Sequence, residues 1–147
     1  MIIIKKASEK NSQVLAQIFS VLYSEEIKSE DKIKSNLING TKEYYLCFVG
    51  KRPVGAISLK FDDKQCELEG IAVRQKEKGY GLRLLQFAEN FARARGCEKI
   101  WCHSLEQHKV KGFYLKCGWK EEKYIINYYP GKNSFTFSKI LSRAMTK

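Results

Sequence analysis

Apolar residues along this chain follow either the alternation typical of strands or the spacing typical of helices. The points where one pattern gives way to the other outline the secondary structure. Alternating or continuous apolar runs bounded by turn residues predict short strands. These strands are expected over residues 2–6, 44–49, 54–61, 66–73, 99–102, 123–128 and 135–141. Other segments carry apolar residues at helical spacing. These helices are expected from Ser8 or Asn11 to Leu22, over 30–38, from Leu82 to Ala94 and from Val110 to Cys117.

The order of these elements defines a fold class. Hairpins of neighbouring strands come first, and strand–helix–strand units follow. This order predicts an α/β (α+β) fold, in which a mixed, mostly antiparallel sheet of about seven strands has helices on both faces. With 147 residues, of which 44% are hydrophobic, the chain can build one domain with a real core, and global disorder is excluded.

The charge is large and unevenly placed. The formal net charge is +11, and residues 51–147 hold 20 basic and 10 acidic side chains, a net of +10. Such an excess predicts an anionic partner, which could be nucleic acid, lipid or a phosphorylated cofactor, or else a solvated lysine-rich surface.

Several classes of protein are not expected. The apolar run after Met1 has three residues, whereas a signal peptide needs about 7–15, and no run approaches the roughly 18 residues of a membrane span. Five cysteines without a Cys-x-x-Cys pair, together with two histidines, make a zinc site unexpected and predict reduced thiols in the cytoplasm.

The most informative segment is a strand that runs through a basic, glycine-containing loop into a helix. Gly79 and Gly81 let a ligand approach the backbone closely, and the free N–H groups of the helix start favour an anion. Arg74, Lys76, Lys78 and Arg83 add positive charge there. The loop matches neither the P-loop nor the dinucleotide-binding fingerprint, so these residues alone leave a solvated helix start as the alternative.

Two motifs make the chain resemble the GNAT superfamily of acyl-CoA-dependent N-acetyltransferases. Ile71-Ala72-Val73 followed by Lys76-Glu-Lys-Gly-Tyr-Gly81 is similar to the family's [QR]-x-x-G-x-[GA] pyrophosphate loop after an apolar strand end. Gly112-Phe-Tyr-Leu-Lys-Cys-Gly-Trp119 is similar to the family's F-Y-x-x-x-G-F signature, with Trp119 in place of Phe. Lys76 stands where the family usually has Gln or Arg. The resemblance implies one N-acetyltransferase domain over residues 1–147.

The resemblance also implies a cofactor site for acetyl-CoA. Ile71 N–H would polarise the acetyl carbonyl, and Val73 would bind the pantetheine amide, with Ala72 between them. The pyrophosphate would lie on the backbone of the loop and helix start. The residues expected to bind the cofactor are Ile71, Ala72, Val73, Lys76, Lys78, Gly79, Tyr80, Gly81 and Leu82.

The reaction that the resemblance implies is direct attack of a primary amine on the thioester, which needs an acid and a base. Tyr114 matches the family's general acid, and a core aromatic residue is the alternative. Glu67 and Glu69 are candidate bases that share one strand face, although the same face could be merely solvated or could attract a cationic amine. His103 is a further candidate base, with a packing role as its alternative.

The expected function is therefore transfer of an acetyl group from acetyl-CoA to the amine of a small molecule or peptide. The alternative is an inactive CoA-binding module used for sensing or interaction. No metal, nucleic acid or membrane is expected to take part, since no reader motif or metal-ligand spacing is present. The resemblance allows a homodimer, and the sequence does not identify the acceptor.

Overall fold

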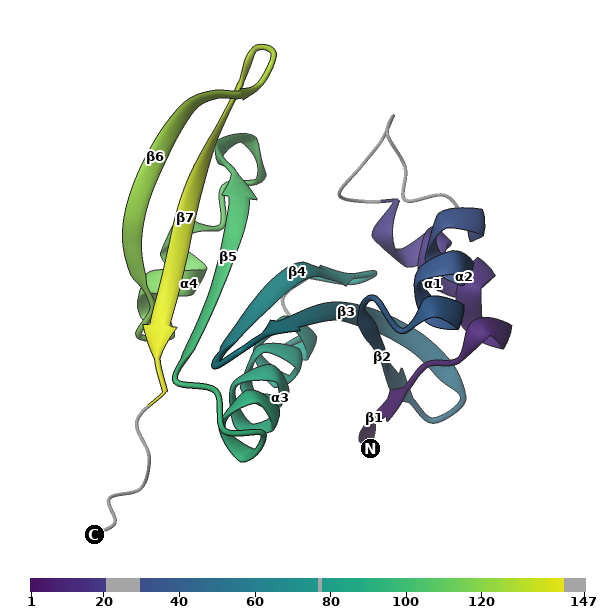
Figure 1. Cartoon of the computed structure of the whole chain (residues 1–147). Helices are drawn as coiled ribbons and strands as arrows, with labels where there is room; N and C mark the ends of the chain where they lie inside the picture. The colour runs from purple at the N-terminus through teal and green to yellow at the C-terminus, as the bar shows by residue number, and fades with distance from the viewer. Residues whose placement is uncertain (21–29, 77, 142–147) are drawn as a thin grey trace, which may run out of the picture. The chain divides into compact units, whose positions relative to one another are not determined.

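A computed structural model describes residues 1–20, 30–76 and 78–141 (Figure 1). The strands are β1 Ile2–Lys6, β2 Glu43–Val49, β3 Arg52–Asp62, β4 Gln65–Val73, β5 Lys99–Leu105, β6 Lys120–Tyr129 and β7 Lys132–Ile140. The helices are α1 Ser12–Phe19, α2 Glu30–Asn39, α3 Tyr80–Ala94 and α4 Lys111–Lys116, with 3-10 turns η1 Glu9–Asn11 and η2 Glu106–His108.

The seven strands form one sheet in the order β1-β2-β3-β4-β5-β7-β6. β4 and β5 pair in parallel, whereas β1 with β2, β2 with β3, β5 with β7 and β6 with β7 pair antiparallel. The predicted mixed, mostly antiparallel sheet is therefore confirmed.

The chain divides into two compact units, which are described separately. The first holds the described residues of Met1–Lys60 together with Glu69–Ala88, and the second holds Phe61–Leu68 and the described residues from Glu89 onward. The interpretation of residues 1–147 as one N-acetyltransferase domain stays a prediction.

In the first unit, helices cover both faces of the strands. Side chains alternate along β2, so successive residues contact helices on opposite faces. Tyr44 and Leu46 lie in a buried cluster with Leu15, Ile18 and Phe19 of α1 and Ile33 of α2. Tyr45 points the other way, and its ring centroid lies 4.9 Å from that of Phe87 on α3. The predicted position of helices on both faces is therefore confirmed for this unit.

Gly55 on β3 shows how closely α3 approaches the strands of the first unit. A Cβ at this position would lie 3.0 Å from Leu84 Cδ1 and 3.1 Å from Ala72 O. Only glycine allows this approach, because even an alanine methyl would push against the helix side chain and the neighbouring backbone.

The helix positions predicted from apolar spacing differ in burial. Ile33 is fully buried in α2, whereas Ile38 near the end of the helix is 60% exposed. Ile38 lies five residues after Ile33, and five residues turn an α-helix by well over one full turn, away from the buried face. Leu22 lies outside the described residues.

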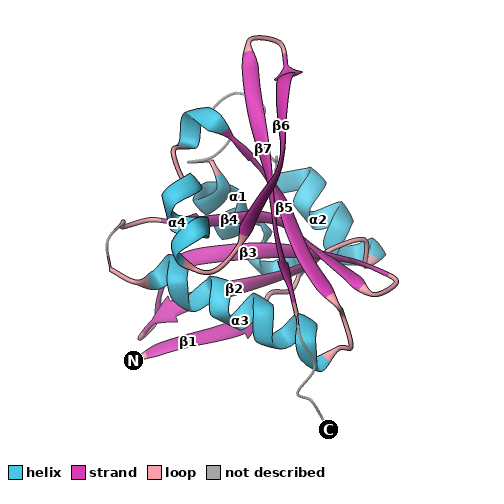
Figure 2. Ribbon diagram, turned by 90° about the vertical axis from the view of Figure 1, so that its left-hand side faces the viewer, coloured by secondary structure: helices cyan, strands magenta, loops and turns pink. Residues whose placement is uncertain are grey.

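In the second unit, β5 lies between β4 and β7, and β6 follows β7 (Figure 2). β5 runs to Leu105, so the predicted end near Cys102 is wrong. The ladder with β7 extends to Leu105↔Ser134, and this pairing supports polar residues that an apolar pattern does not mark as strand. The register of β6 with β7 shifts twice, and Asn127 in the second shift has a left-handed backbone.

Candidate active site

The strand–loop–helix segment predicted to bind the cofactor lies in the first unit. β4 ends at Val73 and α3 begins at Tyr80. Gly79, directly before the helix, has φ +80°, and apart from its chain neighbours no heavy atom of the described residues lies within 4 Å of the place where a Cβ would stand. Glycine adopts this conformation without the cost that other residues incur. Space beside the helix start is therefore open, and its first backbone N–H groups have no partner one turn earlier.

The side chains around this helix start differ in where they point. Lys76 and Lys78 are exposed next to Gly79. Arg74 instead places its guanidinium 3.4 Å from Gln17 Oε1 of α1. The Tyr80 side chain is packed and only 9% exposed, whereas Leu82 is 42% exposed. Lys76 and Lys78 thus supply the positive charge that lies beside the loop.

The backbone orientation at the end of β4 follows from two contacts with β3. Arg74 N–H donates to Val54 O at 2.8 Å, and Ala72 O lies toward Gly55. Because alternate residues of an antiparallel strand direct their polar groups to the same side, Ile71 and Val73 direct theirs away from β3. These two residues also follow Gln65–Glu67, the stretch over which β4 pairs with β5.

Glu69 is held by two side chains of the first unit. Ser58 Oγ donates to Oε1 at 2.8 Å, and Lys42 Nζ lies 2.9 Å from Oε2. The Lys42 and Glu69 side chains are only 16% and 20% exposed, so water screens this ion pair less than a surface pair. The predicted alternative of a merely solvated carboxylate is therefore wrong for Glu69.

Glu67 belongs to the second unit and pairs with Trp101 across the β4–β5 ladder. It is half-buried, like Glu69, Ile71 and Val73, whereas the residues between them are buried. This alternation confirms that the four side chains share one strand face. Glu67 forms no hydrogen bond or ion pair with any residue that the structure describes, so it differs from Glu69.

Tyr114 lies in α4 of the second unit and is 3% exposed. Its ring stacks on Phe137 at a centroid distance of 4.9 Å and lies 5.1 Å from the Trp119 ring. Neighbouring Phe113 is only half-buried. Tyr114 thus has the packing of a core aromatic residue and also a hydroxyl group, which forms a hydrogen bond with Cys102.

The end of α4 explains the spacing of the second motif. Trp119 N–H donates to Tyr114 O at 3.0 Å, and Gly118 N–H donates to Leu115 O at 3.1 Å. Gly118 has φ +86°. These bonds form a Schellman motif, in which a left-handed glycine closes the helix and the next residue packs against its last turn. The motif therefore joins Tyr114 directly to Trp119.

Burial dominates the titration of two polar groups on β5. Burial raises the pKa of the Cys102 thiol to about 12, although hydrogen bonds with Tyr114 and the Phe137 backbone lower it. Burial also lowers the pKa of His103, with Glu67 raising it and Lys123 lowering it further. His103 and Thr136 are register partners of β5 and β7, and their buried Nδ1 and Oγ1 atoms have no hydrogen-bond partner among the residues that the structure describes.

His103 also packs between aromatic rings. Its ring stacks on Tyr128 at 4.9 Å and meets Trp101 edge-on at 5.1 Å. β5 continues two residues beyond His103, to Leu105. Cys97 and Cys102 are buried, whereas Cys117 is only partly buried.

One group of the predicted site residues lies close together because its members are nearly consecutive in the chain. Glu69, Ile71–Val73, the loop and the start of α3 lie in the first unit, whereas Glu67 and Tyr114 lie in the second. Sequence reasoning missed Lys42 and Ser58 as the partners of Glu69. It also missed Glu89, which binds the Trp119 side chain. The replacement of Phe by Trp in the second motif was a usable signal, because a buried indole N–H needs an acceptor.

This strand–loop–helix arrangement is found in known proteins. The chain matches the acetyltransferase (GNAT) family over residues 11–119. It belongs to this family. It is similar to the uncharacterized N-acetyltransferase YitI of Bacillus subtilis (strain 168), with 36% identity over 56 residues, or 37% of this chain. That match covers 36% of YitI, so the chain spans about a third of this relative's length.

Solved structures share the GNAT fold over nearly the whole chain. The ribosomal-protein-S18-alanine N-acetyltransferase from Escherichia coli superposes with a TM-score of 0.86 and 18% identity, covering 99% of this chain and 97% of that one. The PaiA N-acetyltransferase from Thermoplasma acidophilum in complex with coenzyme A has a TM-score of 0.79 and 21% identity, covering 95% and 99%. At these identities the likeness concerns the fold.

Over the part of the chain that the structure describes, no helix is both long and apolar enough to cross a membrane. Among the same residues, no group of three or more His, Cys, Asp or Glu side chains is placed to hold a metal ion.

Proposed function

We propose that this GNAT protein transfers the acetyl group of acetyl-CoA to a primary amine. The observation that carries the proposal is the orientation of Ile71 and Val73, which direct their backbone groups away from β3 just before an open helix start. Strand groups directed in this way can hydrogen-bond the pantetheine arm of a cofactor, and the helix start can hold its pyrophosphate.

The residues at this site fit the cofactor. The open space at Gly79 lets a phosphate approach the N–H groups of Tyr80, Gly81 and Leu82, with Ala72 and Val73 leading into the loop. Exposed Lys76 and Lys78 offer charge to the same anion. When bound, acetyl-CoA supplies the thioester carbon that the amine attacks.

In the proposed reaction the acceptor nitrogen forms a bond to the acetyl carbon while the carbon–sulfur bond breaks. Ile71 N–H donates to the acetyl oxygen as negative charge grows on it. Tyr114 gives its phenolic proton to the leaving sulfur, since a tyrosine is neutral and able to donate at pH 7. One proton of the acceptor ammonium passes to a base before attack, and the second, lost as the amide forms, replaces the proton that Tyr114 has given up.

Glu67 is the proposed base. Glu69 could accept the proton only by weakening its ion pair with Lys42, and both of its oxygens already have partners. Glu67 has no such pair in the described part of the chain and lies on the same strand face. His103 is the second candidate, because burial keeps it neutral and able to accept a proton.

The acceptor is a primary amine of a small molecule or peptide. The Escherichia coli relative in fold is named for the alanine of ribosomal protein S18, so peptide amines belong in the screen beside small amines. Binding of acetyl-CoA is measured by calorimetry, and turnover is followed by release of free thiol across the amine panel. Absence of CoA binding by the folded protein would refute the proposal.

Variants separate the residue roles. Tyr114→Phe is expected to lower kcat by about 10²-fold, with little change in acetyl-CoA affinity. Glu67→Gln is expected to lower kcat by a similar factor, whereas Glu69→Gln acts mainly on stability. Binding of CoA without turnover of any amine would favour the alternative function, an inactive CoA-binding module.

A further inference from the structure

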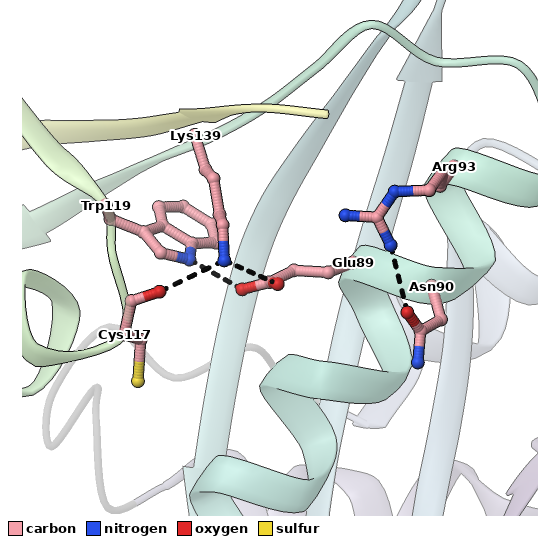
Figure 3. Close-up of polar contacts among 6 residues, drawn as sticks. All are labelled: Glu89, Asn90, Arg93, Cys117, Trp119 and Lys139. Atoms are coloured by element: carbon pink, nitrogen blue, oxygen red, sulfur yellow. Dashed lines mark hydrogen bonds and ion pairs between the residues drawn. The ribbon is translucent and has the colours of Figure 1, made fainter. Parts of the chain in front are cut away.

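A buried carboxylate in the second unit binds the residue that closes α4. Glu89 of α3 is 8% exposed, and its Oε2 accepts a hydrogen bond from Trp119 Nε1 at 2.8 Å. Its Oε1 lies 3.0 Å from Lys139 Nζ of β7, and the same ammonium donates to Cys117 O at 3.1 Å. Figure 3 shows the indole and the ammonium converging on this carboxylate.

Every strong polar group of this cluster has a partner. Each carboxylate oxygen of Glu89 accepts a bond, and the single N–H of the Trp119 side chain donates one. Cys117 O is a carbonyl at the end of α4, where helix geometry leaves carbonyls without partners, and Lys139 supplies one. A buried network that is fully satisfied holds its members in a single arrangement.

Trp119 connects this network to Tyr114. Its backbone N–H donates to Tyr114 O, and its ring contacts the Tyr114 ring. A phenylalanine at position 119 could make both contacts, but only tryptophan adds a side-chain N–H that fixes the ring to α3. The Trp119 ring that packs against Tyr114 is thus held by a hydrogen bond to Glu89.

We infer that Glu89 is a positioning residue for Tyr114, acting through Trp119. The inference rests on the proposed function, in which Tyr114 protonates the leaving sulfur. In this inference Glu89 contacts neither substrate. Lys139 pairs with Glu89 and also donates to Cys117 O at the end of α4. Loss of the bond would leave Tyr114 in place with a less defined hydroxyl position, which lowers kcat without changing cofactor binding.

The test compares kcat and acetyl-CoA affinity in the full chain. Trp119→Phe removes the donor and keeps the ring, and Glu89→Gln removes the charge and keeps Trp119. Each is expected to lower kcat about tenfold, as for loss of one hydrogen bond to a charged group, with the Kd for acetyl-CoA changed less than about twofold. Arg93→Ala is the matched control, since Arg93 on the same helix donates a hydrogen bond to exposed Asn90 at 3.0 Å and to no other described residue (Figure 3).

The decisive readout is the same pair of variants made in Tyr114→Phe. If Glu89 and Trp119 act through the Tyr114 hydroxyl, Trp119→Phe lowers kcat no further in that background. An equal loss with and without the hydroxyl, or a parallel rise in Kd, shows a general structural role and overturns the inference.

Two results tell this inference apart from the proposed function. If Tyr114→Phe itself keeps full kcat, the acid role fails, and the inference fails with it. If Tyr114→Phe loses kcat but neither Trp119→Phe nor Glu89→Gln does, only the inference fails. If Trp119→Phe does not fold, which circular dichroism would show, Glu89→Gln in the two backgrounds decides in the same way.

Discussion

Lys42 of the first unit directs its ammonium nitrogen to within 2.9 Å of Glu69 Oε2, and Ser58 occupies the other carboxylate oxygen. Both oxygens of the Glu69 carboxylate therefore already have partners within the first unit, although Glu69 is a candidate catalytic base. The pair also lies next to buried Tyr44, whose pKa is raised by burial.

Removal of the Lys42 ammonium is expected to destabilise the protein. Lys42→Met leaves the Glu69 carboxylate only partly solvated and without a counter-charge, which should lower the free energy of unfolding by about 2 kcal/mol. Urea unfolding measures this. The matched control is Lys64→Met, whose pair with Glu98 spans 3.7 Å between side chains 61% and 57% exposed, and which should cost less than about 0.5 kcal/mol. Equal losses in the free energy of unfolding at the two sites would contradict the expectation that burial strengthens the Lys42–Glu69 pair.

Substitution of Gly79 is expected to separate cofactor binding from stability. Gly79→Ala forces a methyl group into a left-handed conformation, at a cost of about 1 kcal/mol in the free energy of unfolding. It should also weaken acetyl-CoA binding about tenfold, because the methyl group occupies the open space beside the helix start.

Gly50, in the turn between β2 and β3, provides the control for Gly79. It has φ +63° and equally open surroundings, so Gly50→Ala should cost similar stability and leave acetyl-CoA affinity unchanged. Calorimetric titration of both variants checks this. Unchanged affinity in Gly79→Ala would argue against a phosphate at this loop.

The lowered pKa of His103 predicts a loss of stability in acid. Burial disfavours the charged imidazole, so the unfolded chain binds this proton more readily than the folded one. His103 therefore contributes stability above its ordinary pKa of about 6.5, and this is lost as pH falls through the lower folded pKa. Urea midpoints between pH 7.5 and 5 should fall more steeply in the wild type than in His103→Gln. A slope in His103→Gln equal to that of the wild type would contradict this assignment.

The buried thiol of Cys102 is expected to resist alkylation. Because its pKa is raised to about 12, almost no thiolate forms in the folded protein at pH 8. Iodoacetamide should therefore modify the partly buried Cys117 well before Cys102, and peptide mass mapping measures the order. Rapid labelling of Cys102 in folded protein would show that β5 opens.

The raised pKa of Cys102 also predicts a loss of stability at alkaline pH. Its contribution to stability is complete below about pH 9 and is lost as pH rises toward 12, because the unfolded thiol ionises first. Unfolding midpoints of Cys102→Ala should decline less than those of the wild type over this range.

Elements that carry their own pattern could be predicted from the sequence. β1 Ile2–Lys6 and α2 Glu30–Asn39 stand where apolar spacing and turn residues indicate them. The end of β5 could not be predicted, because His103 and Ser104 become strand residues only through pairing with β7. Strand boundaries of this kind depend on pairing with residues far along the chain, and the local pattern of apolar residues does not indicate that pairing.

The same distinction applies to the candidate site. The strand, Gly79 and the start of α3 are consecutive, so one motif describes them. The contact of Lys42 with Glu69 joins the residue before β2 to β4, and that of Trp119 with Glu89 joins residues 30 positions apart. Each pair depends on tertiary placement, and no spacing in the sequence indicates which acid meets which donor.

The irregular pairing of β6 has a consequence for self-association. β6 is the last strand of the order, and an edge strand offers its outward N–H and C=O groups to other molecules. Two register shifts and left-handed Asn127 break that row into short pieces, and exposed Lys120 and Lys123 repel the same strand of a second copy. Although Ile126 is 70% exposed, this edge is thus a poor template for aggregation through added strands.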